Sequence, residues 1–487
     1  MSQPGLADFL EGLARASHLV RVAAEVDPLL EVAEVSRRVR CQGGPSLLFA
    51  RLKGHHTPVL TNLLIDEPRI CRALEVDCLA EATQRIAAIV GQGGAAPWLE
   101  IISSGVAQGD LQRFLPRTAR TAPCQQVVAL GRDVNLGNLP AIQSWPQEAG
   151  PIITAARLFT KDRDSGRPYV GRHDLRVLDH CRLVACWETY EEPARLWRTY
   201  SGAKERMPVA AVLGGDPVGL LAAMAPVPWQ SDVLWLAGLL RGRPMEMVKS
   251  RTLDLEVPAD AEIVIEGFID PGGALAETGP RGLPNGFCTL GQSGPVIQVT
   301  AVTHRVNPIY PTIVPGPPPD EYSAIFQALQ RIMLPWVRLA VPDLVDYHFP
   351  WFGAARHWGL ISIRKTYPGQ ARRVAHAIWG LRHLMFAKFL VIVDDTVDVQ
   401  DTNQVWAAVA TQADVASDLL LQQGPPDPCD PAAPLATPGW RLVIDATRKL
   451  PGEYEGQRLL PVAPDDVIQK LVSRRWNEYG LRAPTGG

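Results

Sequence analysis

The chain has 487 residues, which is enough for two or three domains with buried cores. It is 46% hydrophobic and 20% charged, as globular proteins are, and this excludes a largely disordered chain. A formal net charge of -3 gives no reason to expect nucleic acid or an anionic membrane as a partner. No apolar run approaches the roughly 20 residues of a membrane span, and the N-terminus lacks a signal-peptide layout, so we expect a cytoplasmic protein.

Helical and extended patterns alternate in the first part of the chain, which predicts an N-terminal α/β domain over residues 1–122. The predicted order is a helix over 9–14, a strand over 19–22, a helix over 30–39, a strand over 46–50 and a helix over 81–90.

Short β-type runs divided by glycine and proline follow, and they predict a sandwich or barrel over residues 123–308. The strands are expected over 151–154, 169–177, 207–212, 261–266 and 295–302, with one helix over 232–240. Residues 309–487 alternate again and predict a C-terminal α/β domain. Its elements are expected over 323–334 (helix), 358–363 (strand), 371–387 (helix), 389–393 (strand), 404–413 (helix) and 465–479 (helix).

The turn Glu-Thr-Gly-Pro-Arg-Gly-Leu-Pro-Asn-Gly-Phe-Cys over 277–288 lies in a longer run that resembles the UbiD family of carboxy-lyases. Further segments that resemble the family occur in order over 139–154, 239–243, 253–267, 342–347, 367–371, 388–395 and 445–453. The resemblance implies a central split β-barrel like that of flavin reductases, between two α/β domains. It also implies prenylated FMN, held through Mn2+ and K+, and the removal or addition of CO2 on aromatic or α,β-unsaturated acids.

Several cofactor positions of the family map onto this chain. The strand motif Asn-x-Gly-x-x-Arg falls on residues 169–174, so Tyr169 stands at the first metal-ligand position and Gly171 is retained. The second metal ligand maps to Tyr190, and the third maps to Glu266, which is retained as a carboxylate. The resemblance further assigns Lys388 and the loop 224–228, with Met224 and Pro226, to the cofactor.

The family's catalytic acids are replaced in this chain. They map to Thr278 and Leu283, neither of which relays a proton as a carboxyl group does. The arginine that holds the substrate carboxylate and pairs with the catalytic acid of the turn in the family maps to Asp174. Side chains two apart on a strand share a face, so Arg172 is a candidate for a relocated clamp that also contacts the cofactor. The alternative is a solvated Arg172–Asp174 pair.

Glu277 lies one residue from the first acid position. It completes a relocated catalytic set with Arg281, Arg172 and Asp174 if the turn is re-registered. The first hypothesis is therefore a UbiD-like decarboxylase with a rewired active site. The second is a catalytically degenerate paralogue that serves as a subunit beside an active homologue, and the third is a protein that binds a nucleotide or aromatic ligand without turnover. The resemblance also implies a homo-oligomer, a dimer or hexamer, in which the helix over 465–479 takes part.

Overall fold

The computed structural model describes residues 5–91, 109–227, 231–353, 356–432, 438–454, 459, 462 and 464–480. Helices and several separate sheets are combined in it, which confirms the predicted α/β class. None of the helices described there is long and apolar enough to cross a membrane. The chain forms two units, Met1–Thr366 with Gln370–Arg448, and Tyr367–Gly369 with Lys449–Gly487.

The helices follow the predicted order and add three that the pattern missed, α3, α6 and α7. The α-helices are α1 (Leu6–Arg15), α2 (Glu31–Cys41), α3 (Glu67–Leu74), α4 (Leu79–Gly91), α6 (Glu192–Ala203), α7 (Pro217–Met224), α8 (Val233–Arg241), α9 (Glu321–Ala340), α10 (Gln370–Gly380), α11 (Thr402–Gln412) and α12 (Asp466–Arg475). Short 3-10 turns occur at η1 (Gly109–Phe114), η2 (Pro123–Gln125), η3 (Gly131–Asp133), η4 (Leu136–Asn138), η5 (Trp351–Gly353) and η6 (Trp476–Tyr479).

A four-stranded sheet belongs to the N-terminal region. Its order is β1 (Leu19–Val26), β2 (Ser46–Leu52), β3 (Val59–Thr61) and β17 (Tyr310–Pro311). The last strand comes from beyond residue 308, so the sheet joins two regions that the sequence predicted as separate domains. Tyr310 is fully buried there and pairs with Val59.

Ten strands form the central sheet, and every strand pairing in it is antiparallel. The main path is β6 (Ile152–Ile153), β9 (Leu175–Val177), β10 (Arg182–Ala185), β16 (Ser293–His304), β14 (Ile263–Ile269), β11 (Met207–Leu213), β7 (Arg157–Lys161) and β8 (Pro168–Arg172). Two short strands, β5 (Val127–Leu130) and β15 (Leu275–Glu277), also pair with β16. Within the described residues no pairing joins the end strands β6 and β8, so the predicted split barrel is not confirmed.

A separate three-stranded sheet has the order β13 (Glu256–Pro258), β12 (Glu246–Lys249) and β4 (Arg117–Thr118).

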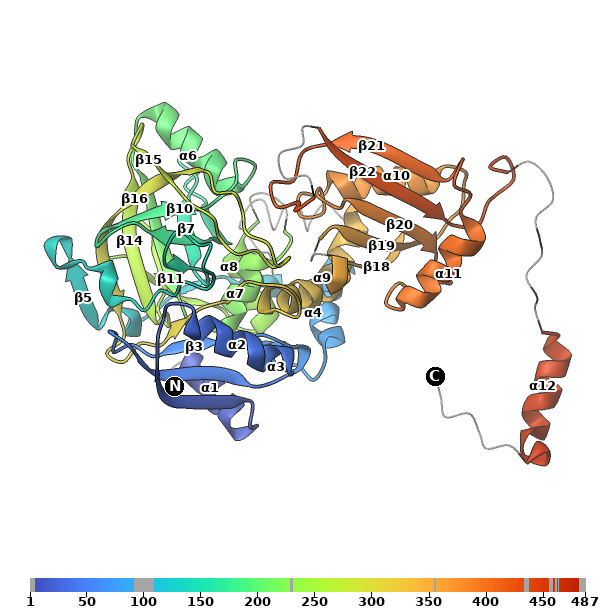
Figure 1. The fold of residues 1–487 in the computed structure, drawn as a ribbon, viewed down its shortest axis with the longest axis horizontal. Helices are drawn as coiled ribbons and strands as arrows, with labels where there is room; N and C mark the ends of the chain where they lie inside the picture. The colour runs from blue at the N-terminus through green and yellow to red at the C-terminus, as the bar shows by residue number, and fades with distance from the viewer. Residues whose placement is uncertain are drawn as a thin grey trace. The chain divides into compact units, whose positions relative to one another are not determined.

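The C-terminal sheet has the order β18 (Leu344–His348), β19 (Trp358–Ile363), β20 (Phe389–Asp394), β22 (Gly439–Ala446) and β21 (Leu419–Gly424), as Figure 1 shows. Successive residues of β20 enter different cores. Leu390 packs in one core with α10, and Val391 packs in another with Val405 of α11. Since successive side chains of a strand point to opposite faces, α10 and α11 cover opposite faces of this sheet. Burial on both faces explains the continuous apolar run of β20.

One predicted helix ends early. The pattern favoured a helix over 371–387, whereas α10 ends at Gly380 and the chain continues in turns. Glycine loses more backbone freedom in a helix than other residues and often terminates one. The turns after Gly380 bring Arg382, His383 and Phe386 to the site described below.

Glu321, the first residue of α9, has 3% of its surface exposed and accepts a hydrogen bond from the Leu64 amide at 2.8 Å. Burial raises its pKa from 4.5 to about 7 in the folded protein. The folded state therefore holds this proton more tightly than the unfolded state, and the contribution to stability is lost as the pH rises between those values.

We expect the free energy of unfolding of Glu321→Gln to fall less steeply than that of the wild type as the pH rises from 4.5 to 7. The difference should be on the order of 3 kcal/mol, because glutamine keeps the acceptor for Leu64 but has no proton to lose. Urea unfolding at a series of pH values measures it. Glu11→Gln, at an exposed position of α1, is the control, and equal slopes for all three proteins would contradict the prediction.

Candidate active site

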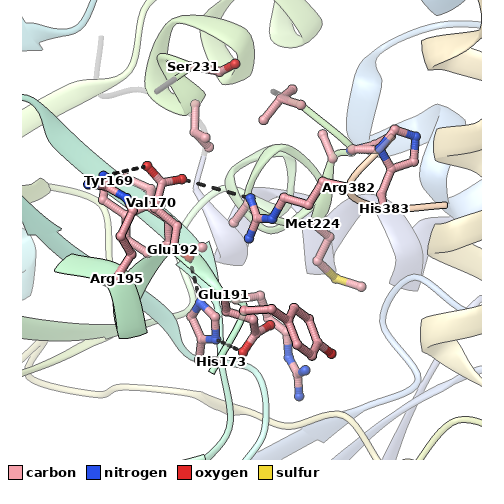
Figure 2. A pocket seen from close by; sticks show the side chains of 18 of the residues that line it. Tyr169, Val170, His173, Glu191, Glu192, Arg195, Met224, Ser231, Arg382 and His383 are labelled. Atoms are coloured by element: carbon pink, nitrogen blue, oxygen red, sulfur yellow. Dashed lines mark hydrogen bonds and ion pairs between the residues drawn. The ribbon is translucent and has the colours of Figure 1, made fainter. Parts of the chain in front are cut away.

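A cavity of about 390 Å3 lies where several segments of the chain meet. They include β8 with the turn before it, the first residues of α6 with the segment before it, the loop after α7, the first two turns of α9 and the turns after α10. Figure 2 shows 18 of the side chains that line it. Part of the wall is apolar, and this part includes Val170, Met224, Val227, Phe326 and Phe386. The charged part contains Arg167, Arg172, Arg195, Arg356 and Arg382, with Asp162, Glu191 and Glu192.

The face of β8 that carries Tyr169 is built around Gly171. The Tyr169 hydroxyl and Nε2 of His173 form a hydrogen bond of 2.7 Å, and a Cβ added at Gly171 would lie 2.2 Å from that hydroxyl. On the other side of the imidazole, Nδ1 lies 3.6 Å from a carboxylate oxygen of Glu191 (Figure 2). The retained glycine therefore makes room for a Tyr169–His173–Glu191 chain of polar groups.

Electrostatics keeps the first two members of this chain neutral. Burial, together with the guanidinium groups of Arg172 and Arg382, lowers the pKa of His173 to about 3. Burial also raises the pKa of Tyr169 well above its usual value, and Glu191 adds to that effect. Burial raises the pKa of Glu191 as well, so this carboxyl group keeps its proton to a higher pH than an exposed glutamate does.

The positions that the resemblance assigns to metal ligands do not form a metal site. Tyr169 is engaged with His173, and Tyr190 packs edge-to-face on Phe386 with the ring centroids 4.9 Å apart. Burial raises the pKa of Tyr190 too, and neutral phenols are poor ligands for a hard divalent cation.

The structure places Glu266 on β14, outside the cavity lining. Its carboxylate accepts hydrogen bonds from the amides of Arg251 and Thr252 at 2.8 and 2.7 Å, and from the Thr252 hydroxyl at 2.8 Å. The expected metal role is thus replaced by a structural one, in which the buried carboxylate holds the bend at 250–253 against the sheet.

Ligand geometry elsewhere supports the same conclusion. Across the described residues, three metal-ligating atoms come within 4.8 Å of one another only at Asp179, His180 and Cys181, which do not line the cavity. Asp179 is already paired with Arg182 at 2.6 Å. The described part of the cavity therefore does not fit the Mn2+ that the resemblance implies.

Asp174 and the turn over 277–288 meet in a buried ion cluster. Arg281 Nε lies 3.4 Å from an Asp174 oxygen, and Arg281 Nη2 lies 3.3 Å from an oxygen of Glu188. Arg172 contacts Asp174 from the other side and also bonds the Tyr322 hydroxyl and the Thr154 carbonyl. The strand-to-turn ion pair that the resemblance implies is thus present with its charges exchanged. The predicted Arg172–Asp174 pair is formed as well, but it is largely buried and not solvated, with side chains 17% and 13% exposed.

Arg281 owes its charge state to these partners. Burial by itself would lower its pKa, yet the carboxylates of Asp174 and Glu188 are among the groups that leave it raised. The guanidinium therefore stays protonated at every accessible pH and balances two carboxylates that have little contact with solvent.

The remaining predicted residues lie outside the cavity lining. Glu277 is exposed at the end of β15, and its carbonyl accepts a hydrogen bond from Arg176 at 2.8 Å, so the re-registered catalytic turn is not formed. The buried Thr278 accepts a hydrogen bond from the Gln292 amide. Lys388 donates to Asp430 at 2.8 Å. Pro228, the end of the predicted cofactor loop, lies outside the described residues.

Six of the predicted residues do line the cavity: Tyr169, Gly171, Arg172, Tyr190, Met224 and Pro226. The sequence analysis missed Glu191, Glu192, Arg195, Arg356 and Arg382. A signal existed for the first two, because two acidic residues before Pro193 mark the start of a helix. Arg382 is also signalled, since Gly380 favours a helix end just before it.

Replacing Arg281 by methionine should lower the free energy of unfolding by about 3 kcal/mol, because Glu188 and Asp174 would keep buried charges with fewer partners. Urea unfolding measures this. The control is Arg364→Met, whose side chain is 74% exposed and whose loss should cost no more than about 0.5 kcal/mol. Equal effects of the two substitutions would show that the Arg281 cluster does not stabilise the fold.

Three family models match the chain in order, and all three describe 3-octaprenyl-4-hydroxybenzoate carboxy-lyase. The UbiD N-terminal domain matches residues 10–89, the UbiD Rift-related domain 117–318 and the UbiD C-terminal domain 323–446. An uncharacterized protein of Aquifex aeolicus (strain VF5) is 35% identical over 482 residues, which cover 98% of each chain.

Solved structures agree with these matches. The closed form of the vanillic acid decarboxylase of Sedimentibacter hydroxybenzoicus shares the fold, with a TM-score of 0.86, 24% identity and 99% of this chain and 100% of its own covered. The UbiD-class enzyme HmfF from Pelotomaculum thermopropionicum, solved in complex with FMN, is 30% identical, with a TM-score of 0.75 over 94% of this chain and 98% of its own. Sequence and structure together show that this chain belongs to the UbiD family.

Proposed function

We propose that this chain is a decarboxylase that acts on an aromatic or α,β-unsaturated carboxylic acid bound in the cavity. The observation that carries the proposal is one cavity with an aromatic and aliphatic wall beside several arginines. An apolar wall favours a planar unsaturated ligand, and guanidinium groups bind carboxylates through paired hydrogen bonds.

The proposal includes a flavin nucleotide, with prenylated FMN as the form that HmfF carries in one of its solved structures. Met224 and Pro226 line the cavity, as expected for a loop along the ring. When bound, prenylated FMN supplies the electron sink that decarboxylation needs. The residues present fit the ring and an anionic phosphate, but they do not fit Mn2+.

Arg172 is the residue that we propose to orient the substrate carboxylate. Its side chain lines the cavity, and its Nε bonds the Thr154 carbonyl at 2.8 Å, while its guanidinium carbon lies 4.4 Å from the centre of the Tyr322 ring. These contacts fix the direction of the planar group, which limits the motion that would otherwise weaken orientation of the substrate.

Glu191 is the residue that we propose to return a proton to the product carbon. Thr278 and Leu283 cannot do so, and Glu191 lines the cavity with a raised pKa. The neutral His173 beside it supplies a path for reprotonation through its ring nitrogens.

The second candidate is a catalytically degenerate paralogue that acts as a subunit. It is favoured by the loss of both turn acids, at Thr278 and Leu283, and by Asp174 at the arginine position. Co-expression with a flavin prenyltransferase, followed by exchange of 13C-bicarbonate into a panel of aryl and acrylic acids, separates the two. Exchange supports the decarboxylase, and its absence in folded, flavin-loaded protein supports the subunit.

A homo-oligomer, a dimer or hexamer, stays part of the proposal. The unit that contains α12 exposes Val467, Ile468 and Leu471 on that helix. HmfF is known in an evolved dimeric form, so dimers occur among the relatives. Light scattering of the full chain measures the mass in solution, and a monomer at micromolar concentration would contradict this part of the proposal.

For the decarboxylase, we expect Glu191→Gln to lower kcat by about 100-fold with little change in KM, because glutamine cannot deliver a proton. Since the pKa of Glu191 is raised, the wild-type kcat should fall as the pH rises through this raised pKa. The variant should lack this fall in kcat. Steady-state rates of CO2 release across pH measure both. Glu205→Gln, at an exposed position just after α6, is the control. A Glu191→Gln enzyme with the wild-type pH profile would remove Glu191 from the reaction.

A further inference from the structure

Arg382 stands among the residues at the positions where the family resemblance implies metal ligands. Figure 2 shows its side chain extending toward Glu192, with Tyr169, His173 and Glu191 close by. Arg382 Nη1 lies 3.9 Å from a Glu192 oxygen, and Arg195 Nη2 lies 3.8 Å from the other oxygen of that carboxylate. One buried carboxylate therefore holds two guanidinium groups at the cavity.

We propose that Arg382 and Arg195 bind the phosphate monoester of a flavin nucleotide directly and replace the divalent metal ion. This inference rests on the proposed function for the identity of the ligand, but it does not require turnover. It adds a phosphate-binding site that differs in chemistry from a metal-bridged one.

The donor chemistry argues for the replacement. A metal that bridges to phosphate requires several anionic or imidazole ligands, and here Tyr169 and Tyr190 are neutral phenols while Glu266 is held at the bend over 250–253. The Nε2 atom of His173, which could bind a metal, already shares a hydrogen bond with Tyr169. An arginine side chain supplies positive charge to the phosphate without the carboxylate and imidazole ligands that a metal ion needs.

Arginines outnumber acidic residues in the cavity lining, where Arg167, Arg172, Arg195, Arg356 and Arg382 stand against Asp162, Glu191 and Glu192. Arg172 and Arg356 are matched by Asp174 and Asp427 outside the lining, which leaves Arg195 and Arg382 as the pair that shares one carboxylate. Asp162 lies 3.5 Å from Arg195, and Glu192 is shared between Arg195 and Arg382. The Arg382 guanidinium also acts on its neighbours, because it is among the groups that lower the pKa of His173 and counter the rise in that of Tyr169.

Arginine is also suited in shape. Its planar guanidinium forms two parallel hydrogen bonds to a phosphate, which a point charge does not. Glu192 keeps 7% of its surface exposed and pairs with both arginines, so it restricts their motion before a ligand arrives. The turn after Gly380 places Arg382 opposite the first turn of α6, which carries Glu192 and Arg195.

The test compares FMN with riboflavin, which has the same ring and no phosphate, by fluorescence titration of the full-length protein. We expect FMN to bind in EDTA at least about tenfold more tightly than riboflavin, and added Mn2+ to change its Kd by less than about twofold. Arg382→Gln should weaken FMN binding by at least about tenfold and leave the Kd of riboflavin unchanged. Arg382→Lys should lie between, because it keeps the charge and loses the paired geometry.

Arg364→Gln is the matched control, since that side chain is 74% exposed and does not line the cavity. A folded wild type that fails to bind FMN, a strict need for Mn2+, or equal losses for FMN and riboflavin in Arg382→Gln would each overturn the inference. FMN binding in EDTA, together with no CO2 exchange by folded protein loaded with prenylated FMN, would refute the proposed function alone. Exchange that EDTA abolishes would keep the function and refute the arginine site.

Discussion

The buried ion cluster of Asp174, Arg281, Glu188 and Arg172 connects the parts of the chain that form the cavity. It joins the end of β8 to the turn over 277–288, to the segment before α6 and, through Tyr322, to α9. A buried charge without its partner is costly, so each of these segments is held in place by the others. The position of Arg172 at the cavity wall depends on this cluster, and so does the direction of its guanidinium.

The exchange of charges within that cluster has consequences for the chemistry. In the arrangement that the family resemblance implies, the strand carries the cation and the turn carries the acids. Here Asp174 follows the strand and the turn carries Arg281, and the one acid of the turn, Glu277, lies outside the cavity lining. The titratable groups at the cavity come from other segments, with His173 just after β8 and Glu191 before α6. A reaction of the family's kind would therefore use a different set of groups on the same scaffold, which agrees with the view that function is decided by the site more than by the fold.

Much of the fold could be predicted because its elements carry strong local patterns. The apolar run at β20 and the central strands β11 and β16 were found at nearly their observed bounds, whereas β5, β7, β10 and β15 were missed. The helix over 371–387 was predicted too long, because its apolar spacing continues past Gly380, where the chain turns. The connection of β17 to the N-terminal sheet was missed, since two residues carry no periodicity and only distant pairing makes them a strand.

Sequence by itself determined the family, the order of the elements and the positions at which tyrosine, aspartate, threonine and leucine replace the expected groups. These follow from residue identities and short-range spacing. Tertiary structure alone decided that Glu266 holds a bend outside the cavity, that Arg281 pairs with Asp174, and that Arg382 meets Glu192. The reason is physical: spacing along the chain sets which face of an element a side chain occupies, but which distant charge it meets depends on how the elements pack.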